Sequence, residues 1–461
     1  MFVGRENELG KLNEMYQSDR FEFAVIYGRR RVGKTTLIRE FMRGKRVIFF
    51  AASESTARDN LISLSRQIGG KNTAPVFADF ESALTEIFDR AEKERLVLVI
   101  DEYPYLAGSS RGISSVLQIL IDHRKETSKL MLVLCGSSMS FMQEQVLGAQ
   151  SPLYGRRTAQ LRILPFTFFD ALPFFSGFDA VQKAELYGCT GGIPEYLNKI
   201  NPQKSVGENI IDLFLTPSGH FFEEPANLLK QELREPATYN AIIEAIAHGA
   251  SRLNEIATKT GIESNKCAKY LLSLIALGLV SKEYPYGETG GRRGIYRLDD
   301  PMFKFWYRFV FPNLSAVVNG LGGIVYQSEV APQLNAYMGF VFEDICKQFL
   351  FLLAKKEALP FGATSFGRWW GTNPKTKTQE EIDLMSAAHK DALFAECKWI
   401  NAAVSEKVYA TLKRRSELFP HAHKHFYLFA KTLFDAPLRK HQGVRLFTVD
   451  EMIQWHEKTS R

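Results

Sequence analysis

The chain has 461 residues, of which 45% are apolar and 24% charged, and it carries a formal net charge of +7 at pH 7. This composition excludes a wholly disordered chain and leaves room for about three domains with buried cores. The moderate positive charge suits a polyanionic partner but does not require one. The apolar runs are too short to span a membrane, and the first residues lack the pattern of a signal peptide. The five cysteines are scattered without a CxxC pair, which indicates a reducing, cytoplasmic setting. Because the apolar runs are short, we also expect no contact with a membrane.

The first informative element is a loop between a predicted strand and a predicted helix. An apolar run covers residues 21–27, residues 28–35 read Gly-Arg-Arg-Arg-Val-Gly-Lys-Thr, and a helical pattern follows. The two glycines allow a tight turn that directs N–H groups at phosphate oxygens; Lys34 can reach the β- and γ-phosphates, and the Thr35 hydroxyl can ligate Mg²⁺. The sequence therefore predicts ATP and Mg²⁺ as cofactors, with the helix N-terminus facing the phosphates. The candidate nucleotide-binding residues are Gly28, Arg29, Arg30, Arg31, Val32, Gly33, Lys34, Thr35 and Thr36.

Polar residues follow two further apolar runs. The run 96–100 ends in Asp101 and Glu102, and the run 130–135 is followed by Ser137. Asp101 would hold Mg²⁺ through water, and Glu102 would polarise the attacking water as the catalytic residue. If the second run lies between the other strands, Ser137 could sense the γ-phosphate; otherwise it only forms a turn. The alternation of strands and helices predicts a parallel sheet covered on both faces.

These features resemble the AAA+-like P-loop ATPases of archaea and bacteria, which are relatives of the origin-recognition ATPases. The resemblance covers roughly residues 1–235 and includes the opening Phe2-Val3-Gly4-Arg5-Glu6 and the segment Gly191-Gly192-Ile193-Pro194. It implies an ATPase in which Arg156 or Arg157 contacts the γ-phosphate, either in cis or from a neighbouring copy in a homo-oligomer. A solvated surface pair is the alternative for these two arginines.

The middle of the chain is expected to form a compact helical module. Amphipathic stretches at 237–247, 252–261 and 265–277 have helix-turn-helix spacing, and residues 279–284 and 294–298 would pair as a hairpin. This pattern predicts a winged helix that contacts DNA, although winged helices also serve as protein-contact modules or lids. The candidate DNA-contacting residues are Asn265, Lys266 and Lys269 on the third helix and Arg292 and Arg293 at the hairpin tip.

The last third of the chain carries a second set of chemically active residues. Glu343 lies in a helix that we expect to open at Gly339, Asp383 lies in a predicted strand, and Glu396 and Lys398 share the next strand. Residues two apart in a strand project to one face, and in a paired hairpin Asp383 can lie beside Glu396. A Mg²⁺ ion between these two carboxylates could activate water, which Lys398 could orient or deprotonate.

This pattern resembles the PD-(D/E)xK nuclease superfamily and the C-terminal domain that accompanies the ATPase family, over roughly residues 335–450. The resemblance implies a restriction-endonuclease-like fold with Glu343, Asp383, Glu396 and Lys398 as catalytic residues. One departure is Ile382, which stands where the motif has proline. An inactive relic of the fold and a purely structural sheet face both remain open.

A histidine triplet entering a later strand is a weaker signal. His421, His423 and His425 alternate and would share one face of a strand, as zinc ligands can. No fourth ligand is evident, so a solvated segment is the favoured interpretation.

We therefore predict an α/β protein with a P-loop parallel-sheet ATPase domain, an α-helical winged-helix module and a C-terminal restriction-endonuclease-like domain. Its predicted function is ATP hydrolysis coupled to DNA binding and metal-dependent DNA cleavage. The alternative is an ATP-gated switch that binds DNA or protein through an inactive tail. The predicted segments are an ATPase core at 1–170, a helical lid at 171–234, the winged helix at 235–315, a linker at 316–334 and the nuclease-like domain at 335–461.

Overall fold

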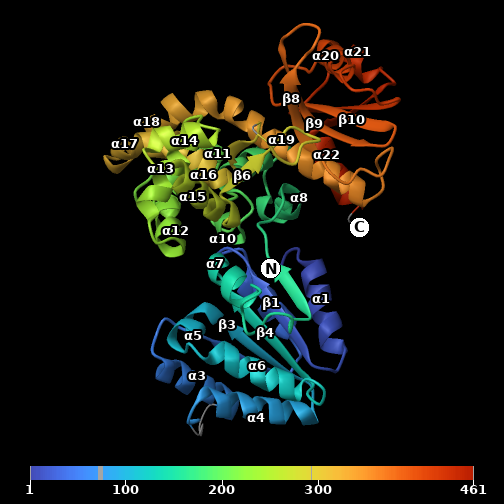
Figure 1. Cartoon of the computed structure of the whole chain (residues 1–461). Coiled ribbons are helices and arrows are strands. Elements are labelled where there is room, and N and C mark those ends of the chain that lie inside the picture. Colours follow the sequence, from blue (N-terminus) through green and yellow to red (C-terminus); the bar gives the residue numbers. More distant parts are fainter. Residues whose placement is uncertain (1, 71–75, 292, 460–461) are drawn as a thin grey trace. The chain divides into compact units, whose positions relative to one another are not determined.

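The structure is a computed structural model that describes residues 2–70, 76–291 and 293–459. The chain divides into two compact units (Figure 1). The N-terminal unit extends to Pro165 and includes the return segment Ile193–Glu195, and the C-terminal unit comprises Phe166–Gly192 and the chain from Tyr196 onward. The predicted DNA contact Arg292 lies outside the described residues. No described helix is both long enough and apolar enough to cross a membrane.

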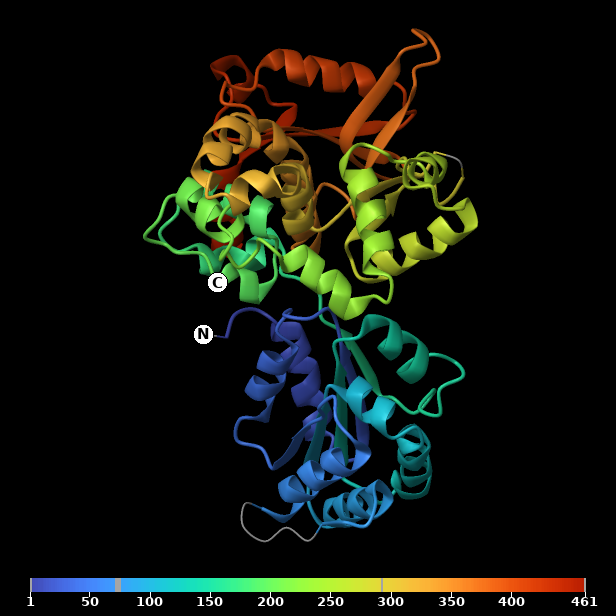
Figure 2. The same ribbon diagram turned by 90° about the vertical axis from the view of Figure 1, so that its left-hand side faces the viewer.

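The N-terminal unit is a five-stranded parallel sheet with helices on both faces (Figures 1 and 2). Its strand order is β2-β3-β4-β1-β5, and every residue of the strands β1, β3 and β4 is buried. Continuous apolar runs of this kind are expected where helices cover both faces of a sheet. The predicted parallel sheet is thereby confirmed. The strands are β1 Glu22–Tyr27, β2 Val47–Ala51, β3 Leu96–Asp101, β4 Leu130–Gly136 and β5 Ala159–Arg162.

The helices of the N-terminal unit alternate with these strands. Two of them begin at polar N-cap residues. The Thr56 hydroxyl and the Asp79 carboxylate each accept a hydrogen bond from a backbone N–H of the first turn. The helices are α1 Glu6–Gln17, α2 Lys34–Met42, α3 Ala57–Gly69, α4 Phe80–Lys93, α5 Tyr103–Ser109, α6 Ile113–Arg124 and α7 Met139–Phe141, the last continued by the π-helical turn η1 Met142–Val146.

The C-terminal unit begins with a helical part. The segment after Phe166 belongs to it because α9 (Ala180–Thr190) packs on the long helix α19 (Ala331–Lys355): the Tyr337 hydroxyl donates to the Gly188 carbonyl at 2.7 Å. A Cβ atom at Gly188 would lie 2.6 Å from the Met338 sulfur, so a larger residue would push this side chain aside. The helices are α8 Phe168–Ala171, η2 Leu172–Phe175, α9 Ala180–Thr190, α10 Pro194–Leu197 (which starts in the return segment), α11 Val206–Phe214 and α12 Glu224–Glu232.

Three helices and a hairpin follow. The helices α13 Pro236–Ala247, α14 Leu253–Thr260 and α15 Ser264–Ala276 enclose a small core, and the antiparallel strands β6 Val280–Glu283 and β7 Ile295–Leu298 come next. A left-handed Gly261 ends α14, which gives the turn between the second and third helices. The region predicted as a linker, 316–334, is helical. Its elements, with those that precede it, are α16 Pro301–Phe305, η3 Trp306–Val310, η4 Phe311–Asn313, α17 Leu314–Val318, α18 Gly322–Val325 and η5 Tyr326–Val330.

The chain ends in a mixed five-stranded sheet of order β12-β11-β10-β9-β8. The pairs β8–β9 and β9–β10 are antiparallel, whereas β10–β11 and β11–β12 are parallel. The α20 residue Leu412 joins the core on one face, and Phe349 of α19 packs on Phe429 and Phe447 on the other. The elements are α19 Ala331–Lys355, β8 Gly367–Thr372, β9 Gln379–Ala388, β10 Asp391–Lys398, α20 Glu406–Ser416, β11 His423–Ala430, α21 Ala436–Arg439, β12 Val444–Thr448 and α22 Val449–Thr459.

The start of α19 differs from the sequence prediction. We expected a helix opening at Gly339, but α19 begins at Ala331 with proline in its first turn. Proline is favoured there because its missing N–H needs no partner and its φ angle is already helical. Glu343 therefore lies in the middle of a 25-residue helix rather than near its start.

The β6–β7 hairpin is fastened to α19 and to the C-terminal sheet. Asp344 accepts hydrogen bonds from Arg297 at 2.6 Å and from Lys304 at 3.2 Å. Burial alone would raise the pKa of Asp344, but Lys304 and Arg297 outweigh it and lower the pKa to about 2. In the hairpin loop, the Tyr286 N–H donates to the Arg368 carbonyl at 2.8 Å, and the Tyr286 hydroxyl accepts from the Ala387 N–H at 2.8 Å.

The pKa of Asp344 predicts how this contact contributes to stability. The folded-state pKa lies below the ordinary value of 3.8, so the stabilisation is present above pH 4 and is lost as the pH falls toward 2. Asp344→Asn should lower the free energy of unfolding by about 1–2 kcal/mol at pH 7, and the difference should shrink at pH 3. Urea unfolding followed by tryptophan fluorescence measures this unit, because all five tryptophans lie in it.

The control is Asp299→Asn, which weakens a more exposed pair 3.9 Å from the same arginine. It should change the free energy of unfolding by less than about 0.5 kcal/mol. Equal effects of the two substitutions, or an Asp344→Asn effect that grows on acidification, would contradict this account.

Candidate functional site

The loop between β1 and α2 is shaped by two glycines. Gly33 has a φ angle of 91°, a left-handed conformation that side chains disfavour. A Cβ atom at Gly28 would lie 2.3 Å from the Ile163 carbonyl oxygen, so the backbone of the chain leaving β5 can approach only glycine. The loop is thus held tightly between β1, α2 and the end of β5.

Lys34 and Thr35 are the first residues of α2, and their side chains contact different groups: Lys34 contacts the loop, and Thr35 contacts Asp101. The Lys34 ammonium group is buried and donates to the carbonyls of Gly28 at 2.8 Å and Arg29 at 3.0 Å, so it lies over the loop. The Thr35 hydroxyl donates to a carboxylate oxygen of Asp101 at 3.1 Å. These two oxygens, one neutral and one charged, are ligands that Mg²⁺ accepts, so the residues present fit this ion.

The acidic pair and Ser137 meet at neighbouring strand ends. Strand β4 lies between β1 and β3, the order that the prediction for Ser137 requires. The Ser137 hydroxyl donates to the Glu102 carboxylate at 2.9 Å, and Asp101 accepts from the Glu102 N–H at 3.0 Å. Glu102 has a φ angle of 50°, a left-handed conformation that costs a non-glycine residue on the order of 1 kcal/mol. The structure therefore brings Thr35, Asp101, Glu102 and Ser137 together at one edge of the sheet.

Other contacts of the loop were not foreseen from the sequence. Arg5 donates to the carbonyls of Val32 at 3.2 Å and Leu164 at 2.5 Å, so the Phe2–Glu6 opening braces the loop. Arg31 lies 3.7 Å from Glu195 of the return segment. The sequence pointed to the opening segment and the return segment only through their resemblance to the family's motifs. Their contacts with the loop could not be predicted, because the residues that meet are more than 25 positions apart in the chain.

Arg156 is not in contact with the loop among the described residues. It forms a bidentate ion pair with Asp122 of α6, in which its Nε and Nη2 atoms lie 2.8 and 2.6 Å from the two carboxylate oxygens. It also donates to the Pro152 carbonyl at 2.9 Å. The hydrogen bond with Arg156 lowers the pKa of Asp122. Arg157 donates to the Leu147 carbonyl at 3.5 Å. A γ-phosphate contact by either arginine stays a prediction.

A buried strand, a Gly-Lys-Thr loop capping a helix, and an acidic pair on the second strand along define a P-loop ATPase. Residues 2–200 match a family described as an ATPase domain predominantly from Archaea, and residues 306–410 match archaeal and bacterial proteins of unknown function. The uncharacterized protein MJECL04 of Methanocaldococcus jannaschii is 36% identical over 431 residues, which cover 91% of this chain and 92% of that protein. The chain belongs to the same family and is an archaeal-type P-loop ATPase.

Two further comparisons concern parts of the chain. The uncharacterized ATP-binding protein MJ0423 of the same organism is 43% identical over 47 residues, which cover 10% of this chain and 80% of that protein. The solved structure of the Walker-type ATPase PABY2304 of Pyrococcus abyssi has a TM-score of 0.51 at 20% identity, covering 67% of this chain and 96% of that one. At this identity the likeness shows a shared fold.

The predicted DNA-contacting residues have two different settings. Asn265, Lys266 and Lys269 are all exposed on α15. Arg293 instead pairs with Glu288 and reaches the Trp370 carbonyl at 3.5 Å, so it faces the C-terminal sheet. Lys266 lies 4.0 Å from Glu235 and over the Tyr270 ring at 5.6 Å, so these contacts are looser than those that Arg293 would have to leave.

The C-terminal sheet brings Asp383, Glu396 and Lys398 together. The Lys398 ammonium group lies 2.7 Å from Glu396 and 3.8 Å from Asp383, and Asp383 accepts from the Cys397 N–H at 2.8 Å. Burial and then repulsion by Asp383 raise the pKa of Glu396, and the same two causes raise the pKa of Glu343 to about 8. Burial alone would lower the pKa of Lys398, but Asp383 and Glu396 raise it.

These shifts describe an acidic cluster that one ammonium group neutralises only in part. Within the part of the chain that the structure describes, no three His, Cys, Asp or Glu side chains are grouped closely enough to hold a metal ion. The histidine triplet is included in this statement, and His425 pairs with Asp391 at 3.0 Å. Mg²⁺ nevertheless commonly binds one or two carboxylates and takes its remaining ligands from water and phosphate, which Asp383 and Glu396 fit.

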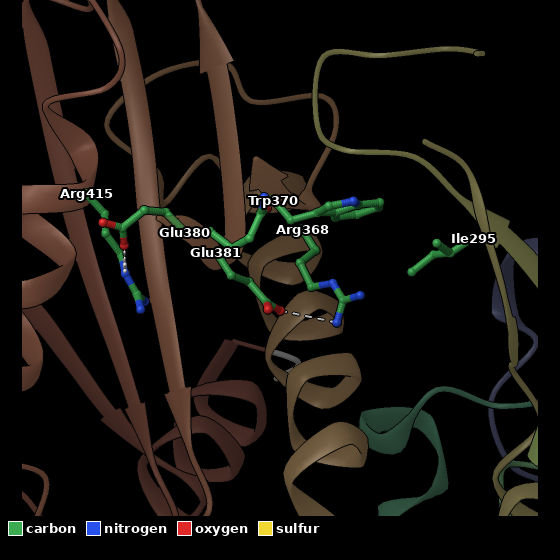
Figure 3. A pocket seen from close by; sticks show the side chains of 7 residues that line it. Ile295, Arg368, Trp370, Glu380, Glu381 and Arg415 are labelled. Carbon is green, nitrogen blue, oxygen red and sulfur yellow. Dashed lines mark hydrogen bonds and ion pairs between the residues drawn. The ribbon is translucent and has the colours of Figure 1, made fainter. Parts of the chain in front are cut away.

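Arginines of α20 and a pocket complete this region, and neither was predicted. Arg415 lies 3.4 Å from Glu396 and 3.1 Å from Glu380. Arg414 binds Glu380 as well, in a bidentate ion pair with both carboxylate oxygens. Nothing in the linear sequence links these arginines to the carboxylates. A pocket of about 450 Å³ adjoins them (Figure 3). It is lined by Ile295, Arg368, Trp370, Gln379, Glu380, Glu381 and Arg415.

The geometry at the strand ends predicts separate effects on ATP binding and hydrolysis. Glu102→Gln keeps the shape of the side chain but removes the base, so hydrolysis should fall by about 100-fold or more while ATP binding persists. Titration calorimetry and a phosphate-release assay measure the two quantities. Glu94→Gln is the matched control, because Glu94 precedes the opposite end of β3 and pairs with Arg46. Retention of full hydrolysis in Glu102→Gln would show that another residue polarises the water.

Proposed function

We propose that ATP hydrolysis in the N-terminal unit controls a C-terminal unit that binds DNA and cleaves it with a divalent cation. The observation that carries the proposal is that the Lys398 ammonium group lies within 3.8 Å of both Asp383 and Glu396, which stand on adjacent strands. Two carboxylates and a lysine in this arrangement can hold a cation and orient water against a phosphodiester.

The order of elements supports a nuclease-like fold for the tail. A helix, three antiparallel strands, a helix and a parallel strand follow one another as α19, β8, β9, β10, α20 and β11. Glu343 lies on the helix, and Asp383, Glu396 and Lys398 lie on two paired strands, as the resemblance to PD-(D/E)xK nucleases leads us to expect. Glu343 is close enough to Asp383 for its pKa to respond.

DNA binding is proposed for the α13–α15 helices and the β6–β7 hairpin, which together resemble a winged helix. Lys266 and Lys269 are exposed on the third helix, at the position that enters a major groove in such modules. The chain's net charge of +7 suits the same partner.

In the nucleotide site, each residue has a proposed task. Thr35 and Asp101 would hold Mg²⁺, which neutralises phosphate charge when bound. Lys34 would turn from its two carbonyl partners to the β- and γ-phosphates. Glu102 would polarise the attacking water, and Ser137 keeps the Glu102 carboxylate in position through their hydrogen bond. A phosphate that displaced Ser137 from Glu102 would free this carboxylate for the water.

In the tail, Asp383 and Glu396 would hold the cation, which supplies Lewis-acid activation of water when bound. Lys398 orients the water from its position beside both carboxylates. Glu343 carries a proton at pH 7, because its pKa is about 8. This proton keeps the cluster from carrying three negative charges.

A second function from a different class also has an observation in its favour. The Lys398 ammonium group already bridges Asp383 and Glu396, so the cluster is partly neutralised without a cation. The chain would then be an ATP-gated switch whose tail grips DNA or a protein without cutting.

Cleavage of plasmid DNA in the presence of Mg²⁺ and ATP separates the two functions. Lys398→Met keeps the aliphatic stem and removes the charge, so it should reduce cleavage by about 100-fold or more and leave ATP hydrolysis intact. The control Lys407→Met removes an exposed lysine of α20 and should leave both activities unchanged. Wild-type protein that binds but never cuts DNA would favour the switch.

Arg156 is proposed to act on the nucleotide of a neighbouring copy, because within its own chain it is bound to Asp122. Arg156→Ala and Lys34→Ala should each hydrolyse ATP at least about 100-fold more slowly than wild type. A mixture of the two should regain activity, since one copy supplies the loop and the other the arginine. A mixture that stays inactive would refute action across an interface, whereas normal hydrolysis by Arg156→Ala would remove the arginine from the mechanism.

A further inference from the structure

The pocket beside the carboxylate cluster contains a tryptophan whose setting the fold alone does not explain. Trp369 and Trp370 are adjacent on β8 and project to opposite faces. Trp369 packs on Phe419 at 5.0 Å and belongs with the apolar core under α20. Trp370 lines the polar pocket instead, and among the described residues its ring meets no other aromatic ring.

The pocket wall leads from Trp370 to the carboxylates. Trp370 pairs with Glu381 across the β8–β9 ladder, and Asp383 lies two residues further along β9. Figure 3 shows Trp370 and Arg368 pointing from the sheet toward the strand that carries Ile295. The opposite wall of the pocket is therefore formed by β7 of the hairpin, and its floor is formed by the strand that bears the catalytic candidate.

Arg368 is held beside the indole ring. Its guanidinium carbon lies 5.2 Å from the centre of the Trp370 ring, and its Nη1 lies 3.2 Å from Glu381. Its Nε is buried 3.9 Å from Glu283 and makes no hydrogen bond within the described residues. The arginine is thus anchored by ion pairs, and its pairing with the half-exposed Glu381 can be exchanged for a stronger anion.

The other acidic lining residue is already neutralised. Glu380 accepts hydrogen bonds from both Arg414 and Arg415, at 2.6 to 3.1 Å. An incoming phosphate would consequently meet guanidinium groups on both sides of the pocket. An aromatic platform between arginines is the combination that single-stranded nucleic-acid sites use.

We infer that this pocket is a subsite for one unpaired nucleotide of DNA, with its base stacked on Trp370 and its phosphate bound by Arg368. The inference rests on the proposed action of the tail on DNA. The volume of about 450 Å³ lies in the range of pockets that hold one small ligand, far below the room that a duplex needs. A base can offer its face to an indole only when it is unstacked from its neighbours, so an end, flap or gap in the DNA is the form bound.

Binding is tested on the full chain with EDTA present, so that the result does not depend on cleavage. A hairpin oligonucleotide with an unpaired tail is compared with the same hairpin ending bluntly. The tailed form should bind about fivefold to tenfold more tightly, and Trp370→Ala should remove this advantage. Arg368→Gln should weaken binding of the tailed form but not of the blunt one. A blunt hairpin that binds as tightly as the tailed one would overturn the inference.

Tryptophan fluorescence gives a second measurement that a folding defect cannot imitate. Stacking on a base should quench the indole, so the tailed oligonucleotide should quench the wild-type signal. Trp370→Phe should keep the affinity, because phenylalanine also stacks, but lose this quenching. The control Trp455→Phe, on α22, should keep both. Quenching that survives in Trp370→Phe would overturn the inference. Because neither binding measurement requires cleavage, the proposed nuclease activity is tested separately, by DNA cleavage in the presence of Mg²⁺.

Discussion

The hydrogen bond between Thr35 and Asp101 joins two groups that stand 66 residues apart in the chain and two strands apart in the sheet. It is possible only because β1, β4 and β3 are parallel and end at the same edge. The buried, continuous apolar strands fix the position of that edge, and the polar residues that follow these strands therefore lie side by side there. The loop glycines, the left-handed Glu102 and the Ser137 contact all serve this one alignment.

The C-terminal unit solves an electrostatic problem in a different way. Asp383 and Glu396 are buried on neighbouring strands, where their mutual repulsion would destabilise the fold. Lys398 and Arg415 offset that repulsion, because they lie 2.7 Å and 3.4 Å from the Glu396 carboxylate. A divalent cation would offset the same repulsion, so it could replace one of these cationic groups beside the carboxylates. The same arrangement would also be stable without a metal ion, which is why the two proposed functions are alternatives for this unit.

The sequence predicted those features that are written locally. The phosphate loop, the acidic pair after β3 and the ExK strand each consist of residues within ten positions of one another, and their strand or helix context follows from apolar periodicity. The start of α19 differs from the prediction because Gly339 resembles a helix boundary, whereas the true start is marked by Pro332 in the first turn. The carbonyl partners of Arg5 and the carboxylate partners of Arg368 and Arg415 could not be predicted, because side-chain contacts between separate segments leave no pattern in a single sequence.

The attachment of Tyr286 to β8 and β9 has a bearing on solubility. Strand β8 is at the edge of the C-terminal sheet, and an edge strand with free N–H and C=O groups tends to recruit strands from other molecules. The hairpin loop covers part of that edge by bonding to the Arg368 carbonyl and by burying the tyrosine ring against the sheet core. Cutting the chain between the hairpin and α19 would uncover this edge. The isolated C-terminal part from α19 onward is therefore expected to self-associate, and the hairpin protects the intact chain from aggregation through this edge.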